Sequence, residues 1–276
     1  LVNAGDEGVR RPDFGLDDYR AMVRKLPHWA KDEAVHTQKS RDMRMLLWDY
    51  VIVLANSGII DPERIESYIA ADGYQALYDV LREMEPNEVV EERVTSGLRG
   101  RGGAGFPVGL KWGTVSKSPG AKKYVVCNAD EGEPGTFKDR LLVDFDPHAV
   151  LEGIAIAAYA CQMQTAYFFI RGEYHHQAKV FQKALEEAYA NGVFGKQGLM
   201  NGKSKFAVDC HMHRSAGAYI CGEETALIES LEGKRGNPRI KPPFPAVVGL
   251  YGNPTVVNNV ETIMDVPWIV MNGGEE

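Results

Sequence analysis

The feature that most constrains the fold of this 276-residue chain is an alternation of strand-like and helix-like segments over residues 123–232. Short apolar runs are typical of buried strands, and longer amphipathic runs are typical of helices. The expected strands cover residues 123–127, 166–171 and 206–212, and the expected helices cover 147–163, 173–191 and 221–232. This order predicts an α/β fold, with a Rossmann-like, mostly parallel sheet and helices on both faces. Ligands of such sheets bind beyond the carboxyl ends of the strands.

The part of the chain before this domain is expected to be an arm and a helical lead-in. Residues 1–40 are polar and predict an extended arm, and residues 41–96 predict a mostly helical lead-in. Within it, the apolar run 44–55 fits a strand or a buried helix equally well. Asp61 as a cap and Pro62 in the first turn predict a helix that Gly73 ends, and residues 74–84 and 86–94 predict two more. Residues 97–276 would form the α/β domain.

Composition excludes several classes of protein. The net charge is −7, from 31 bases and 38 acids, which disfavours a nucleic-acid binder. No apolar run is long enough to span a membrane, and the N-terminal residues lack the core of a signal peptide. The four cysteines are widely spaced without a C-x-x-C pair, so neither a zinc nor an iron–sulfur framework is expected. Sparse cysteines suit a reducing cytoplasm.

A glycine-rich stretch precedes the first expected strand. Residues 96–112 read S-G-L-R-G-R-G-G-A-G-F-P-V-G-L-K-W, and six of these seventeen residues are glycine. Because glycine loses much entropy on folding, a dense run is useful mainly where the backbone must approach something closely. Backbone that carries positive charge and a flat apolar ring suits a ligand with a phosphate and an aromatic system, such as a nucleotide or a flavin. The alternative is a surface loop with incidental glycines.

Two known phosphate-binding loops do not match this stretch. Gly100, Gly102 and Gly105 satisfy G-x-G-x-x-G, but the Rossmann fingerprint follows a buried strand and opens a helix. Here the preceding residues look helical, and Pro107 and Gly109 argue against a long helix directly afterwards. A Walker A loop fails too, because no Gly-Lys-Ser/Thr follows the last glycine. A Rossmann dehydrogenase with a substrate of its own is therefore disfavoured.

Polar segments follow the expected strands. After the first strand, N-A-D-E-G-E-P-G-T-F-K-D-R places Asn128 among acidic residues that could hydrogen-bond a flavin or nicotinamide ring. A solvated turn is the alternative. After the third strand, G-A-Y-I-C-G-E-E-T-A-L places Tyr219 before a helix start, where an aromatic ring could contact a ligand. Its two glutamates could instead serve the helix dipole.

Two further segments suit a dinucleotide. In K-P-P-F-P-A, three prolines hold Phe244 rigidly near Lys241, which suits an adenine and a pyrophosphate. In V-N-N-V-E-T, Asn258 and Asn259 stand at an apparent helix start. Asparagine caps helices readily, and helix N-termini also bind phosphate, so both roles remain open.

Together these five motifs resemble one family, with a match from about Gly97 to Gly273. The family comprises the NADH-binding FMN flavoprotein (51 kDa-type) subunit of respiratory complex I and its relatives, the diaphorase subunits of NAD-linked hydrogenases and formate dehydrogenases. The resemblance implies FMN as cofactor and NAD(H) as substrate. The implied FMN-site residues are Gly100, Arg101, Gly102, Gly103, Lys111, Asn128, Asp130, Glu131, Tyr219, Gly222, Glu223, Glu224, Asn258 and Asn259. The implied NADH contacts are Phe106, Glu133, Glu224, Lys241 and Phe244.

The resemblance also implies an activity. A member of this family is an NADH dehydrogenase module that passes a hydride from the nicotinamide C4 to the flavin N5, and then single electrons to iron–sulfur clusters, in either direction. No protein acid or base is required, although Glu131 and Glu133 would flank the two rings. Glu224 would face the adenosine ribose and repel the extra phosphate of NADPH. A flavin-free scaffold subunit is the alternative, but the glycine and Asn-Asp-Glu motifs are intact.

The resemblance further implies partners and a location. The family continues into a ubiquitin-like domain and a helical domain whose four cysteines hold a [4Fe–4S] cluster. The cysteines of this chain do not match that spacing, so we expect the cluster outside these residues and no metal ligands within them. The expected partners are iron–sulfur subunits, in particular a 24 kDa-type thioredoxin-like [2Fe–2S] subunit. The expected location is cytoplasmic, including peripheral attachment to the cytoplasmic face of the inner membrane.

Overall fold

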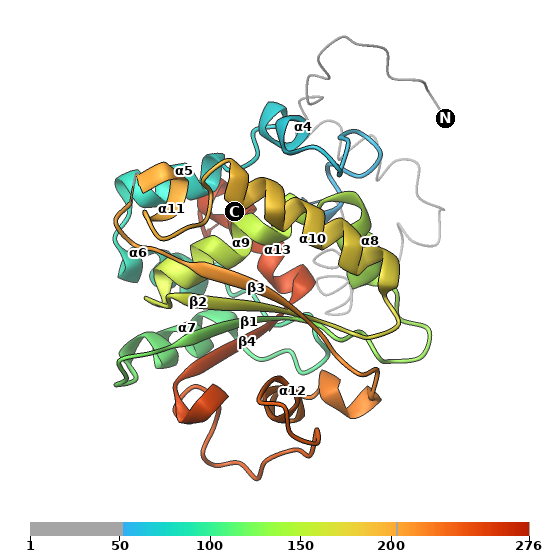
Figure 1. Cartoon of the computed structure of the whole chain (residues 1–276). Coiled ribbons are helices and arrows are strands. Elements are labelled where there is room, and N and C mark those ends of the chain that lie inside the picture. Colours follow the sequence, from blue (N-terminus) through green and yellow to red (C-terminus); the bar gives the residue numbers. More distant parts are fainter. Residues whose placement is uncertain (1–51, 203, 276) are drawn as a thin grey trace, which may run out of the picture.

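A four-stranded parallel sheet forms the centre of the computed structural model, which describes residues 52–202 and 204–275 (Figure 1). The strands are β1 (Tyr124–Ala129), β2 (Thr165–Ile170), β3 (Asp209–Arg214) and β4 (Thr255–Asn259). Their order is β3-β2-β1-β4, and every neighbouring pair is parallel. The predicted Rossmann-like α/β sheet is confirmed.

The strand order contains one reversal, and this reversal positions the site. From β1 the chain moves outward to β2 and β3, and then returns to place β4 on the other side of β1. β1 and β4 are therefore the pair at which the sheet changes direction, with Asn128 opposite Asn259 at their carboxyl ends. In open α/β sheets this switch point leaves a crevice in which ligands bind.

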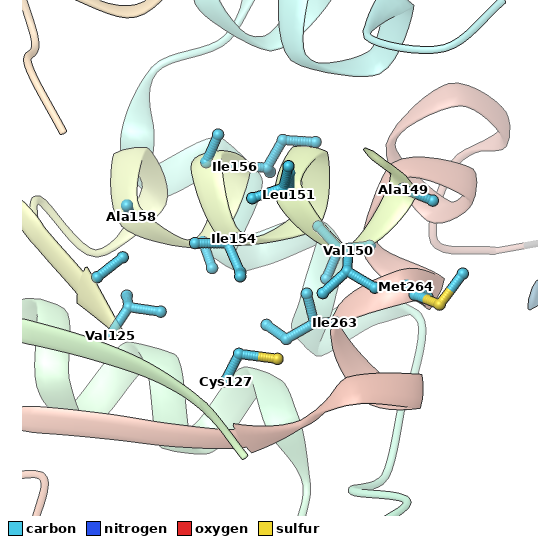
Figure 2. Close-up of a cluster of buried hydrophobic side chains, with 14 of the residues drawn as sticks. Val125, Cys127, Ala149, Val150, Leu151, Ile154, Ile156, Ala158, Ile263 and Met264 are labelled. Carbon is cyan, nitrogen blue, oxygen red and sulfur yellow. The ribbon is translucent and has the colours of Figure 1, made fainter. Parts of the chain in front are cut away.

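Helices cover both faces of the sheet, as predicted (Figure 1). The helices α9 (Pro147–Ala160), α10 (His175–Ala190) and α13 (Val260–Asn272) cover one face, and α12 (Glu224–Leu231) covers the other. Side chains of β1 alternate between the two layers, because successive residues of a strand point to opposite faces. Val125 and Cys127 belong to the core under α9 and α13, shown in Figure 2, whereas Val126 packs in the cluster of Leu227 from α12.

Close packing of α9 and α13 fixes where α13 begins. A Cβ atom at Gly153 of α9 would lie 2.2 Å from the carbonyl oxygen of Ile263, so the two helices cross with their backbones almost in contact. Ile154 and Ile263 complete this contact above the sheet (Figure 2). The N-terminus of α13 is thereby held at the end of β4, beside the switch point.

The lead-in contains three described helices: α4 (Ile65–Ala70), α5 (Gln75–Glu83) and α6 (Pro86–Thr95). The last two confirm their predictions. The prediction that a helix starts just after Asp61 is wrong, because the Asp61 carboxylate accepts the Glu63 N–H at 3.0 Å and closes a turn. The helix starts at Ile65, whose N–H donates to Glu187 of α10. The predicted arm, and most of the apolar run 44–55, lie outside the described residues.

The sequence analysis did not predict several other elements. The expectation that no long helix follows Pro107 is wrong, because α7 (Val108–Lys117) begins directly after it. Gly109 serves packing, since a Cβ there would lie 2.6 Å from the Val94 nitrogen of α6. The predicted helix over 221–232 divides into a 3₁₀ turn, η1 (Tyr219–Gly222), and α12. The remaining unpredicted elements are α8 (Lys138–Phe145), α11 (Leu199–Gly202), η2 (Leu250–Gly252) and β4. Among the residues described, no helix has the length and apolar character needed to cross a membrane.

Candidate functional site

The glycine stretch forms a closed loop at the carboxyl end of the sheet. Its two ends pair through an antiparallel bridge between Arg99 and Pro107, and the Gly100 N–H donates to the Phe106 carbonyl at 2.9 Å. The Arg101 N–H donates to the Thr262 hydroxyl at 2.8 Å, which ties the loop to the first turn of α13. The loop is thus held against the switch point by α13, and its glycines present bare backbone there.

An open cavity of about 570 Å³ lies between this loop, the segment after β1, the end of β4 and the turn η1. This volume is typical of a pocket for a cofactor-sized ligand. The cavity is lined by Arg101, Gly102, Gly103, Asn128, Asp130, Glu131, Gly132, Glu133, Thr136, Lys138, Asp139, Tyr219, Ile220, Gly222, Glu223 and Asn259. Residues of four predicted motifs, far apart in the sequence, therefore line one cavity.

Most of the predicted site residues line this cavity directly. The eleven that do are Arg101, Gly102, Gly103, Asn128, Asp130, Glu131, Glu133, Tyr219, Gly222, Glu223 and Asn259. The predicted residues outside the lining are Gly100, Phe106, Lys111, Glu224, Lys241, Phe244 and Asn258. Gly100 closes the loop, and several of the others form the charged and aromatic rim described below.

Two buried polar atoms at the switch point have no hydrogen-bond partner among the residues that the structure describes. Asp130 is 8% exposed, and its Oδ2 atom accepts no hydrogen bond. Burial is the main reason that the pKa of Asp130 rises to about 6, although Arg171 opposes the rise. Asn258 is 5% exposed, and its Nδ2 donates to nothing. Because unsatisfied buried polar groups are costly, these two atoms are candidates for hydrogen bonds to a bound ligand.

Other predicted residues use their polar atoms within the protein. The Asn128 Nδ2 donates to the Gly222 carbonyl at 2.9 Å, and its Oδ1 accepts the Asp130 N–H, so it joins β1 to η1. The Glu131 carboxylate accepts the N–H groups of Asp139 and Arg140 at the start of α8. The acidic motif therefore supplies both a carboxylate in the cavity wall, Asp130, and one that accepts hydrogen bonds from the first turn of α8, Glu131.

The structure adds five cavity residues that the sequence analysis missed: Gly132, Thr136, Lys138, Asp139 and Ile220. Four of them lie inside the motif N-A-D-E-G-E-P-G-T-F-K-D-R, so the motif itself was the available signal. A Cβ on Gly132 would lie 3.1 Å from the Tyr219 ring. One on Gly222 would lie 3.0 Å from the Asp130 carbonyl, so the loops meet where side chains larger than glycine do not fit.

The rim carries a chain of ion pairs and exposed aromatic rings. Lys241 contacts Glu223 at 2.9 Å and Glu224 at 3.2 Å, and Glu224 also contacts Lys111 at 3.3 Å. Burial would lower the pKa of Lys241, but its hydrogen bonds and ion pairs with both glutamates raise it, so the lysine stays charged. Phe106 and Phe244 are each more than half exposed, and the Tyr219 hydroxyl donates to Glu133. Exposed rings of this size are typical of a ligand-binding surface.

Comparison with known proteins explains this arrangement. Residues 94–268 match the family described as the Nuo51 FMN-binding domain, and the chain belongs to this family. The matched residues include the glycine loop, the acidic motif and both asparagines at the end of β4. The fold and cavity therefore define a flavin-mononucleotide-binding domain of the kind found in complex I.

Several named relatives are similar over most of this chain. A subunit of the NADH-quinone oxidoreductase of Rhizobium meliloti is 54% identical over 80% of this chain and 52% of its own length. The NADP-reducing hydrogenase subunit HndC of Solidesulfovibrio fructosivorans is 49% identical over 81% of this chain and 45% of its own length. A solved NAD⁺-reducing [NiFe]-hydrogenase in the H₂-reduced state matches 69% of this chain and 32% of its own with a TM-score of 0.63 and 42% identity. The chain spans about half the length of the curated relatives that it matches.

The residues of the cavity fit FMN. Asp130 and Asn258 offer one buried acceptor and one buried donor without protein partners, as a polar ring or a ribityl chain requires. The glycine loop brings backbone and the Arg101 side chain to the cavity, as a phosphate requires. Gly132 and Gly222 let the acidic loop and η1 pack closely, because a Cβ at either position would crowd the facing loop, and this packing shapes the cavity wall.

Proposed function

We propose that this chain is the FMN- and NADH-binding module of a multi-subunit NADH dehydrogenase. The observation that carries the proposal is the cavity at the β1–β4 switch point, where Asp130 presents an unpaired buried carboxylate oxygen inside the FMN-domain match. FMN supplies the chemistry when bound, since it accepts a hydride at N5 from the nicotinamide C4 and releases electrons one at a time. The protein binds, orients and shields the two rings.

The proposed roles divide along the cavity. The glycine loop with Arg101 and Lys111 holds the phosphate end of FMN. Asn128, Asp130, Gly222 and Asn258 surround its ring and ribityl chain, together with Glu131, Tyr219, Glu223 and Asn259. The support for this division is that the unpaired Asp130 oxygen follows the end of β1 and the unpaired Asn258 nitrogen lies in the last residues of β4, whereas the glycine loop is tied to α13.

NADH is proposed to bind over the rim. Phe106, Phe244 and Tyr219 offer exposed aromatic surface for stacking, and Glu133 beside the Tyr219 hydroxyl lies at the cavity mouth. Lys241 carries the positive charge that a pyrophosphate requires. Electrons then leave to iron–sulfur clusters of other domains or subunits, and a 24 kDa-type thioredoxin-like [2Fe–2S] subunit is the proposed neighbour. The proposed location is the cytoplasm or the cytoplasmic face of the inner membrane.

The proposal is tested by reconstituting the protein with FMN and measuring steady-state reduction of ferricyanide by NADH. We expect FMN to bind at a ratio of about one per chain and NADH to drive turnover without added partners. Tight binding of FMN without any turnover would support the proposed FMN site but overturn the proposed NADH site. Failure to bind FMN would overturn the proposed function.

Replacing Glu224 by glutamine is expected to relax the choice between NADH and NADPH. Glu224 lies between Lys111 and Lys241, and without its charge both lysines are left to attract the additional phosphate of NADPH. We expect the kcat/KM for NADPH, relative to NADH, to rise about tenfold, which corresponds to roughly 1.4 kcal/mol at the transition state.

Glu229 offers the matched control for this substitution. It also forms ion pairs, but with Arg239 and Lys234 rather than with the two lysines that flank Glu224. Glu229→Gln should leave the coenzyme ratio unchanged. A ratio that is also unchanged in Glu224→Gln would contradict the proposed position of the adenosine ribose.

A further inference from the structure

Lys138 lines the cavity, yet its ammonium group is fully occupied by the protein. It contacts the Asp139 Oδ1 at 2.6 Å, the Asn259 Oδ1 at 2.8 Å and the Glu261 Oε2 at 2.9 Å. An ammonium group has three N–H donors, so these three acceptors use all of them. Lys138 therefore has no donor left for a ligand, and its effect on the cavity must pass through the groups that it holds.

The group held most firmly is the carboxamide of Asn259. Its Oδ1 accepts both from Lys138 and from the Glu261 N–H at 3.2 Å, and its Nδ2 donates to the Asp139 Oδ2 at 2.6 Å. These contacts fix the orientation of the side chain. The glycine loop rests on it, because a Cβ at Gly102 would lie 3.2 Å from the Asn259 Cβ. The glycine loop thus packs against an asparagine whose side chain Lys138 holds.

The same ammonium separates two buried carboxylates. Asp139 is 3% exposed and Glu261 is 6% exposed, and both contact Lys138. Burial is the main reason that the pKa of Asp139 rises to about 6, Lys138 opposes this rise, and Glu131 adds to it. The other titratable groups nearby are the buried Cys127 thiol of β1, and Tyr174, which donates to Glu131. Arg171 donates to the Glu131 carbonyl at 2.7 Å and brings positive charge to that side of the cluster, whereas Lys138 contacts both Asp139 and Glu261 directly.

We infer that Lys138 is a positioning residue for the FMN site, whose ammonium holds Asn259 and two buried carboxylates in the arrangement that seats the glycine loop at the cavity. The inference rests on the proposed function, because it assigns a role in binding FMN. The Lys138 side chain joins α8 to the junction of β4 and α13, which lies 121 residues further along the sequence. Asn259 then supports the glycine loop, while its carboxamide makes its hydrogen bonds to Lys138, Asp139 and Glu261.

The test is the Kd for FMN of the wild-type protein and Lys138→Met, measured by quenching of flavin fluorescence. Without the ammonium, the pKa of Asp139 rises further, so its carboxyl is mostly protonated at about pH 6 and carries more negative charge at about pH 8. At the higher pH, unbalanced carboxylates displace Asn259 and repel the FMN phosphate. We expect the variant's Kd, divided by that of the wild type, to be about threefold at the lower pH and tenfold or more at the higher pH.

Three further variants separate this role from general destabilisation. Lys123→Met removes another partly buried lysine, one that bonds the carbonyls at the end of α7, and should leave the Kd for FMN unchanged. Lys138→Met combined with Asp139→Asn removes the excess charge and should abolish the pH dependence of the Kd ratio. Lys138→Gln keeps a polar side chain without the charge, and it should show the same pH dependence if Lys138→Met does not fold.

The possible outcomes are distinct. A Kd ratio near one at both pH values in Lys138→Met, or in Lys138→Gln, would overturn the inference. The Kd ratio of Lys138→Met could instead be raised equally at both pH values. If the double variant with Asp139→Asn then gave the same ratio, Lys138 would not act by balancing charge. Absence of FMN binding in the wild type would instead overturn the proposed function.

Discussion

Replacing Gly222 by valine is expected to weaken FMN binding by about a hundredfold or more, corresponding to roughly 3 kcal/mol. Gly222 lines the cavity, and a Cβ there would lie 3.0 Å from the Asp130 carbonyl oxygen before any branch is added. A branched side chain must therefore push η1 away from the end of β1. That shift also breaks the hydrogen bond from the Asn128 Nδ2 to the Gly222 carbonyl. The measurement is the Kd for FMN from quenching of its fluorescence.

Gly113 provides the control for this substitution. It lies in α7, and an added Cβ would meet only the Val90 side chain, at an ordinary 3.8 Å. Gly113→Ala should bind FMN like the wild type and should be more stable, because alanine favours a helix by about 1 kcal/mol over glycine. Wild-type affinity in a folded Gly222→Val protein would show that the contact between η1 and the end of β1 does not shape the FMN site.

Replacing Asp130 by alanine is expected to weaken FMN binding about thirtyfold, or roughly 2 kcal/mol, as for a lost hydrogen bond to a charged group. The reason is that Asp130 lines the cavity, and its buried Oδ2 has no hydrogen-bond partner among the described residues. Asp130→Asn, which keeps an acceptor but loses the charge, should fall between alanine and the wild type. The measurement is again the Kd for FMN, at about pH 8 where the carboxylate is ionised.

The same carboxylate should destabilise the protein without FMN. Burial raises the pKa of Asp130 to about 6, so the folded state binds a proton more tightly than the unfolded state. The free energy of unfolding then falls as the pH rises from the unfolded pKa toward 6, and the cost is fully present above it. Asp130→Asn should therefore stabilise the FMN-free protein at about pH 8 by about 1 kcal/mol, a discounted figure because the open cavity lets solvent screen the charge.

The pH dependence provides the check on this account. The stabilisation by Asp130→Asn should disappear below about pH 4, where the unfolded carboxyl is also protonated. Thermal unfolding of both proteins across this range measures it. If Asp130→Asn is destabilised at the higher pH and still binds FMN like the wild type, then Asp130 is a structural residue.

The sequence predicted those parts of the site that follow strands or lie in the motifs. Asn128 and Asp130 were predictable because they follow a short apolar run, and parallel sheets bind ligands at that end. The strand β4 was missed because its five residues end in two asparagines, which also suit the start of a helix. In the structure, Asn259 is both the last residue of β4 and the N-cap of α13. The helix α7 was missed because proline and glycine usually interrupt helices, whereas here Gly109 permits contact with α6.

The roles that depend on distant contacts were not predictable. Lys138 and Asp139 lie in a motif that the sequence analysis had singled out, but no periodicity or spacing relates them to Asn259. Their interaction exists only because α9 and α13 pack tightly enough to hold the end of β4 beside the start of α8. Likewise, the sequence predicts Glu131 as a ligand contact. The structure shows that its carboxylate accepts the N–H groups of Asp139 and Arg140 at the start of α8.

The central claim is that FMN bound in this cavity takes a hydride from NADH. The most direct measurement is the absorbance spectrum of the FMN-reconstituted protein before and after NADH is added without oxygen. We predict that the flavin bands near ~370 and ~450 nm bleach within the mixing time with NADH, and far less with NADPH. A flavin that stays oxidised with NADH, or a protein that stays colourless after reconstitution, would contradict the claim.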